Sequence, residues 1–214
     1  MNTQEHVSPY TAVHASFGSC GFLAHQGLVA DTYSRKGFIP SESASDLIDA
    51  YDTEDTKYGL LYAQDTASTL TGTFRLIHGS AGLPIFGVFP HLPVAGIHAR
   101  LCESTRVVSK KLGLAGRSNP ARHVLFDVVL QSLGYARAYA LMGTVSLGSP
   151  IVFDWINETF LGCQRALASP LLYKNGVVIP SVIWTDEFEQ IIQQHIPSLF
   201  PYYAGIVESW KIKT

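Results

Sequence analysis

Short runs of alternating or β-branched apolar residues recur along the chain, and this pattern is typical of β-strands. Such runs predict strands over residues 58–64, 69–77, 101–109, 166–173 and 177–184. The first two flank a short polar turn and so predict a hairpin. The Asn175-Gly176 pair predicts a second hairpin between the last two. Residues 136–142, which are mostly apolar, predict one more, buried strand.

Helical spacing of apolar residues, with start and stop signals, predicts the helices. They are expected over residues 19–35, 120–133, 150–161 and 186–195. Pro120 fits a first helical position, Gly134 a helix stop and Thr185 an N-cap. Residues 1–16 are expected to form a loose arm, and residues 41–55 an acidic loop. Residues 83–93 are expected to be irregular with one short helix at most, and residues 197–214 to form a partly packed aromatic tail.

This order of elements predicts a mixed α/β fold around one central sheet, in a single domain spanning residues 1–214. The chain is 47% hydrophobic and 15% charged, which is typical of a globular protein. A net charge of −2 gives no reason to expect nucleic acid as a partner. No apolar run is long enough to span a bilayer.

Cysteine and histidine are too scattered to predict a metal site or a disulfide framework. The three cysteines are far apart in sequence and fit a reducing compartment, and the eight histidines show no ligand spacing. The first residues lack the basic start and apolar run of a signal peptide. We therefore expect a cytoplasmic protein without a metal.

Two charges interrupt the predicted strand 101–109. Glu103 and Thr105 share one face of this strand, while Arg106 points to the other. Charges in a buried strand are costly unless they are paired or used. A carboxylate held there, with a pKa raised by burial, could act as a general base. The alternative is a structural ion pair with a basic residue.

The same pattern of a charge in or beside a strand occurs at Asp49, Asp52 and Arg75. If these side chains meet Glu103 and Arg106 in space, the cluster could hold the charged ends of a polar substrate. A salt-bridge network with a purely structural role is the alternative.

Six of the 15 Lys and Arg residues lie between residues 100 and 122, a segment with one acidic residue. Its candidate contacts to an anionic partner, such as a phosphopantetheine arm or an acidic carrier protein, are Lys110, Lys111, Gly113, Arg117 and Arg122. The alternative is a flexible connection between a strand and a helix.

Five fragments in order resemble the acyl-homoserine lactone (autoinducer) synthases. They are Asp49-Ala-Tyr-Asp52, Tyr58-Gly-Leu-Leu61, Gly72-Thr-Phe-Arg-Leu-Ile77, Phe89-Pro-His-Leu92 and Glu103-Ser-Thr-Arg106. The resemblance implies a fold like the GNAT acetyltransferases. It also implies transfer of a fatty acyl chain from acyl carrier protein, or from acyl-CoA, to the amine of S-adenosylmethionine, followed by lactone closure.

The resemblance also implies roles for individual residues. Glu103 would be the base that deprotonates the amine, with Thr105 beside it. The amine substrate would be bound by the family-equivalent residues Tyr33, Asp49, Asp52, Arg75 and Arg106. We expect the thioester near residues 140–145, with Met142 and Thr144 as contacts, and no tightly bound cofactor.

The first hypothesis is therefore synthesis of an acyl-homoserine lactone, a quorum-sensing signal. At three positions the chain departs from the family pattern, with Val29, Ile39 and Leu47 in place of Arg, Trp and Glu. These positions lie where the amine substrate binds. Three fragments, Gly37-Phe-Ile39, Leu83-Pro-Ile85 and Tyr173-x-Asn-Gly176, resemble instead the related N-acyl amino acid synthases, which acylate a free amino acid. A non-catalytic binding protein for acyl or amino-acid ligands is a further alternative.

Overall fold

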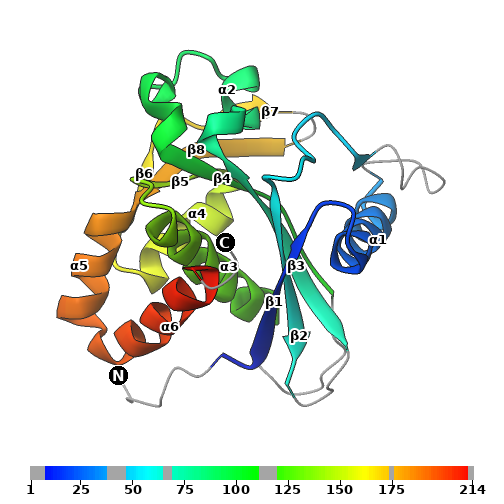
Figure 1. Ribbon diagram of the computed structural model, residues 1–214. Coiled ribbons are helices and arrows are strands. Elements are labelled where there is room, and N and C mark those ends of the chain that lie inside the picture. Colours follow the sequence, from blue (N-terminus) through cyan, green and yellow to red (C-terminus); the bar gives the residue numbers. More distant parts are fainter. Residues whose placement is uncertain (1–7, 38–46, 65–68, 111–119, 174–175, 212–214) are drawn as a thin grey trace. The chain divides into compact units, whose positions relative to one another are not determined.

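The computed structural model describes residues 8–37, 47–64, 69–110, 120–173 and 176–211 (Figure 1). The chain divides into two compact units. The first unit comprises residues Ser8–Ile77 and Ser104–Val129, and the second comprises Met1–Val7, His78–Glu103 and Leu130–Thr214. Strand β4 (Leu101–Ser109) and helix α3 (Pro120–Ala138) each contribute residues to both units.

Antiparallel strands with a helix against them form the first unit. Strand β1 (Tyr10–Ser16) pairs with β2 (Lys57–Ala63), and β2 pairs with β3 (Leu70–His78), which confirms the first predicted hairpin. The expected loose arm is therefore wrong for residues 10–16, because they pair along their whole length with β2 and the side chain of Tyr10 is buried. Residues 1–7 lie outside the described residues.

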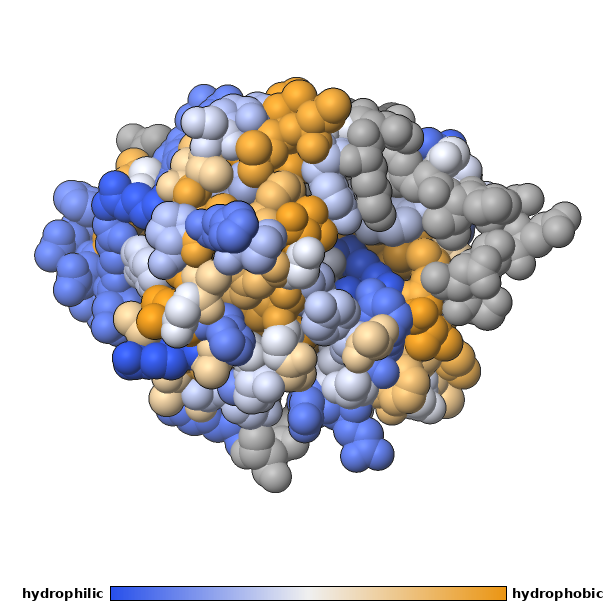
Figure 2. Space-filling model, turned by 90° about the horizontal axis from the view of Figure 1, so that it is seen from above, coloured by the Kyte–Doolittle hydropathy of each residue, from blue (hydrophilic) through white to orange (hydrophobic). Residues whose placement is uncertain are grey.

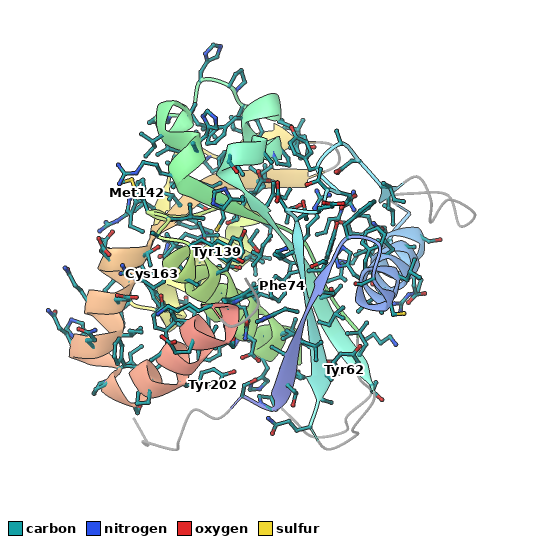
Figure 3. The ribbon with its side chains drawn as sticks, in the orientation of Figure 1. Tyr62, Phe74, Tyr139, Met142, Cys163 and Tyr202 are labelled. Carbon is teal, nitrogen blue, oxygen red and sulfur yellow. The ribbon has the colours of Figure 1, made fainter. Side chains whose placement is uncertain are left out.

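Helix α1 (Cys20–Arg35) lies against β1 and β2 of this unit (Figure 1). It begins where predicted, because the Ser19 hydroxyl accepts a hydrogen bond of 3.2 Å from the Phe22 N–H. On the strands, Thr73 and Arg75 alternate with Phe74, whose ring packs over Gly59. Phe74, labelled in Figure 3, thus lies on the opposite side of the strands from Thr73, which contacts His25 of α1.

The second unit is built on β5 (Gly143–Gly148), which runs parallel to the start of β4 and antiparallel to β8 (Gly176–Trp184). Strand β8 also pairs with β6 (Gln164–Ala166) and β7 (Leu171–Tyr173). The register Tyr173↔Gly176 confirms the second hairpin. The mixed α/β fold expected from the sequence is confirmed.

Four α-helices of the described residues lie wholly in the second unit: α2 (Pro84–Val88), α4 (Pro150–Thr159), α5 (Thr185–His195) and α6 (Phe200–Lys211). The aromatic tail thus forms a regular helix. Large apolar side chains such as Ile151 and Leu172 are exposed in this unit. The face drawn in Figure 2 accordingly shows apolar atoms among polar ones. Within the described residues, no helix is both long and apolar enough to cross a membrane.

The predicted strand over 136–142 is wrong, because α3 continues to Ala138 and the next strand begins only at Gly143. Gly134 does not end α3 but lies buried inside it. A Cβ added at this glycine would lie 2.5 Å from Ile206 Cγ2 of α6. The missing side chain therefore permits close packing of two helices.

This packing predicts that Gly134→Ala lowers the free energy of unfolding by about 1–2 kcal/mol, because the added methyl group overlaps a branched side chain. Gly205→Ala is a matched control on α6, where a Cβ would meet nothing within 4 Å. That change should be neutral or stabilise by up to about 1 kcal/mol. Urea denaturation of the three proteins measures both effects. Equal effects of the two substitutions would contradict the packing role of Gly134.

Candidate active site

Two arginines and two aspartates of the first unit form a closed network of ion pairs. Arg75 Nη1 lies 2.9 Å from Asp49 Oδ1 and 3.0 Å from Asp52 Oδ1. Arg106 reaches the other oxygens of the same carboxylates, with Nη2 at 2.9 Å from Asp49 and Nη1 at 3.1 Å from Asp52. Four of the predicted substrate-binding residues are thus brought together, and we call them the charged network.

The described part of the acidic loop begins at residue 47, and its local structure presents both carboxylates. The Asp49 N–H donates to Asp52 Oδ2 at 2.9 Å, and the Tyr51 N–H donates to Asp49 Oδ1 at 2.9 Å. Asp and Asn favour such turns because their side chains bond nearby backbone N–H groups. Thr56 donates its hydroxyl to the Tyr51 carbonyl and so closes the loop.

Arg106 adopts a left-handed backbone conformation with φ of 52° in β4. A non-glycine residue in this region costs on the order of 1 kcal/mol and persists only where its surroundings hold it. The two ion pairs of its guanidinium provide that hold. Its position in the network is therefore set by contacts and not by strand alternation alone.

Asp52 is the buried centre of the network, and its side chain has no exposed surface. Burial alone would raise the pKa of this carboxyl group. Hydrogen bonds from the Tyr58 hydroxyl, at 2.7 Å, and from the Asp49 backbone, together with the Arg75 charge, outweigh burial and lower the pKa below its ordinary value of 3.8. Burial and the Asp52 carboxylate raise the pKa of Tyr58, so this hydroxyl remains a donor.

The carboxylate of Glu103, the predicted base, is held in the second unit. It is 3% exposed, and its Oε2 accepts a hydrogen bond of 2.8 Å from the Ile85 N–H at the start of α2. This bond fixes the orientation of the carboxylate. Thr105 follows in the first unit and is half-buried. The predicted meeting of Glu103 with the charged network stays a prediction.

The other predicted contacts lie apart from the charged network or outside the described residues. Tyr33 packs with Leu28, Val29, Leu47 and Val108 in an apolar cluster of the first unit. Lys110 and Arg122 also belong to the first unit, and both are exposed. Lys111, Gly113 and Arg117 lie outside the described residues.

Met142 and Thr144 belong to the second unit. Met142, labelled in Figure 3, is half-buried just before β5, and its N–H donates to the Arg100 carbonyl at 2.7 Å. Thr144 is buried, and its Oγ1 lies 3.2 Å from Cys102 Sγ. Burial raises the pKa of the Cys102 thiol to about 12, so this cysteine is not a thiolate nucleophile.

Sequence reasoning missed two residues beside the charged network, Tyr58 and His25. The ring of His25 lies against the ring of Tyr58, with centroids 4.8 Å apart, and its Nδ1 lies 2.8 Å from Thr73 Oγ1. The available signal was a histidine on the apolar face of a predicted helix, which is usually a core residue. Among the described residues, no group of three or more His, Cys, Asp or Glu side chains is placed to hold a metal.

Solved structures of acyltransferases share this mixed α/β fold, which is GNAT-like. BjaI, a CoA-dependent acyl-homoserine lactone synthase solved with SAM and isopentyl-CoA, matches with a TM-score of 0.60 and 15% identity over 86% of this chain and 89% of its own. The AHL synthase LasI matches with a TM-score of 0.59 and 17% identity over 82% and 91%. FeeM, an N-acyl amino acid synthase from uncultured soil microbes, matches with a TM-score of 0.58 and 17% identity over 86% and 99%.

Within this class, the family model of the N-acyl amino acid synthase FeeM matches residues 24–146, which is more than half of the chain. The chain therefore belongs to the FeeM family. No curated protein matches it in sequence. The resemblance to autoinducer synthases and N-acyl amino acid synthases is confirmed, as is the expected GNAT-like fold.

The buried position of Asp52 predicts that Asp52→Asn lowers the free energy of unfolding by about 3 kcal/mol near neutral pH, because two arginines lose a shared counter-charge. A carboxyl group whose pKa is lowered on folding contributes its stability above the unfolded pKa and loses it as the pH falls through the folded pKa. The difference between the two proteins should therefore shrink below pH 3.8.

Asp31→Asn is the control, since Asp31 pairs with Arg35 on the surface of α1 with side chains 54% and 57% exposed. Exposed pairs of this kind contribute about 0.5 kcal/mol at most. Urea denaturation at several pH values measures all three proteins. A pH-independent difference between wild type and Asp52→Asn would contradict the electrostatic role.

Proposed function

We propose that the protein is an N-acyltransferase that moves an acyl chain from a thioester to the amino group of a free amino acid. The observation that carries this proposal is the family match over residues 24–146, which includes the charged network and Glu103. The donor would be acyl carrier protein or acyl-CoA, as the CoA-dependent synthase BjaI illustrates for the fold. The site of action would be the cytoplasm.

In this mechanism, Glu103 is the general base. The amine nitrogen attacks the thioester carbonyl, an N–C bond forms, and the C–S bond breaks to release the thiol. The proton lost by the nitrogen passes to the carboxylate and then to the leaving thiolate. The Ile85 N–H would keep the carboxylate in one orientation throughout.

The charged network would bind the charged groups of the amino acid. Of its four side chains, only Asp49 is substantially exposed, at 41%. Its carboxylate would receive the ammonium group, and Arg106, at 10% exposure, the carboxylate. The exposed Lys110 and Arg122 would contribute to binding an acidic carrier protein, together with Lys111, Gly113 and Arg117.

A second candidate is acyl-homoserine lactone synthesis from S-adenosylmethionine. The likeness of the fold to BjaI, solved with SAM, and to LasI favours it. The two candidates share the acyl-transfer step and differ in the amine and in lactone closure.

Glu103→Gln should reduce thiol release from the acyl donor at least about 100-fold, because an amide cannot accept the proton. The measurement is the rate at which free thiol appears with a panel of amino acids and acyl donors. Glu208→Gln, an exposed change on α6, should leave the rate within about twofold of wild type. Full turnover by a folded Glu103→Gln protein would contradict the assignment of the base.

Mass spectrometry of lipid extracts from expressing cells distinguishes the two candidate products. We expect N-acyl amino acids that are absent from cells expressing Glu103→Gln. Acyl-homoserine lactones in their place would establish the second candidate. If the two extracts are identical, the protein does not transfer acyl chains in those cells.

A further inference from the structure

Helix α1 presents several buried polar atoms that have no hydrogen-bond partner. In the described part of the chain, these atoms are His25 Nε2, both side-chain amide atoms of Gln26, and Thr32 Oγ1. The three residues are 0%, 7% and 6% exposed. Arg75 Nε, in the charged network, is also unpaired. Buried polar groups in folded proteins almost always have partners, so each of these atoms requires a hydrogen-bonding group beside it.

Hydrogen bonding determines which nitrogen of His25 is protonated. The Thr73 hydroxyl donates its only proton to the Gly59 carbonyl at 2.7 Å. Thr73 Oγ1 can therefore only accept from His25 Nδ1, 2.8 Å away. Burial, the charge of Arg106 and the charge of Arg75 lower the pKa of His25 to about 3. The imidazole is thus neutral at pH 7. Its Nε2 carries a lone pair that can accept a hydrogen bond from a donor group.

The chemistry of these atoms disfavours an acyl chain as their partner. A methylene chain offers no hydrogen bond, so it would leave every one of them unsatisfied. A cationic group beside His25 is also disfavoured, because the charges of Arg75 and Arg106 already oppose a positive charge on the imidazole itself. The partner that fits is an uncharged group with a hydrogen-bond donor, such as a hydroxyl or an amide.

We propose that His25 and Gln26 are specificity-determining residues for the amine substrate, and that they bind an uncharged polar side chain of that amino acid. This inference rests on the proposed function and adds to it the chemistry of the amino acid. Nε2 of His25 would accept from the side-chain hydroxyl or amide. Gln26 would offer both a donor and an acceptor. A buried water without any role in binding would satisfy the same atoms, and the test must separate the two occupants.

Two conservative variants separate the two ring nitrogens of His25. His25→Asn places its amide near the position of Nδ1 and keeps the bond to Thr73, but it removes the Nε2 acceptor. His25→Gln extends its amide to the position of Nε2. Thr71→Val is the matched control, since Thr71 is a buried residue of the same unit whose hydroxyl is paired with the Leu61 carbonyl at 2.7 Å.

The experiment compares amino acids of similar shape that differ in one donor: serine with alanine, threonine with valine, asparagine with leucine, and tyrosine with phenylalanine. Wild type should favour the polar member of at least one pair about tenfold or more in kcat/KM. His25→Asn should bring that ratio close to one, through KM for the amino acid and not for the acyl donor. His25→Gln should keep most of the ratio, and Thr71→Val should keep all of it.

A wild-type ratio near one in every pair would overturn the inference, and so would a wild-type ratio retained by His25→Asn. The second result would mean that only water occupies the site. If His25→Asn does not fold, Gln26→Met takes its place, because it removes both unpaired amide atoms at similar volume.

A second measurement distinguishes failure of this inference from failure of the proposed acyl transfer. It is the shift of the melting temperature on adding amino acids without an acyl donor. A shift by a polar amino acid that His25→Asn abolishes supports the inference even if wild type releases no thiol, in which case the proposed function fails. Turnover without selectivity leaves the proposed function standing and overturns the inference. A shift by S-adenosylmethionine that His25→Asn leaves unchanged, without any shift by amino acids, also overturns it.

Discussion

The first unit depends on the buried carboxylate of Asp52, which joins the acidic loop to three strands. It takes charged or hydroxyl donors from Tyr58 on β2, Arg75 on β3 and Arg106 on β4. Moving such a charge out of water costs several kcal/mol, and the cost is offset only when its oxygens are well bonded. Here both oxygens accept bonds, and the loop backbone at Asp49 adds another.

This requirement explains why the charged network could be predicted from sequence. Arg75 and Arg106 interrupt otherwise apolar strands, and a buried charge needs an opposite one nearby. The acidic loop offered the carboxylates, so the convergence followed from the cost of burial. Tyr58 and His25 could not be found in this way, because aromatic and imidazole side chains in apolar patterns usually serve as core residues.

The errors in the fold have a similar cause. Residues 136–142 are mostly apolar apart from Arg137, and a short run of this kind fits the end of a buried helix as well as a buried strand. Gly134 resembled a helix stop because the sequence does not show that Ile206 of α6 packs against it. Residues 10–16 resembled a loose arm because they follow a polar start and Pro9, and because their pairing with β2 is a long-range contact. Each of these errors concerns a contact between residues far apart in the sequence, which the local pattern of apolar and polar residues does not show.

The electrostatics of the first unit also bear on the chemistry of acyl transfer. The amine must be neutral when it attacks, yet a free amino acid carries an ammonium group at neutral pH. Arg106 and Arg75 help to hold the pKa of His25 at about 3, and the same positive potential acts on any titratable group bound beside that ring. It would favour loss of a proton from a bound ammonium group, whereas the nearby aspartates would oppose this. For the proposed acyl transfer, the mutual pairing of two arginines with two aspartates would therefore allow the site to bind an amine without holding it permanently in its unreactive, protonated form.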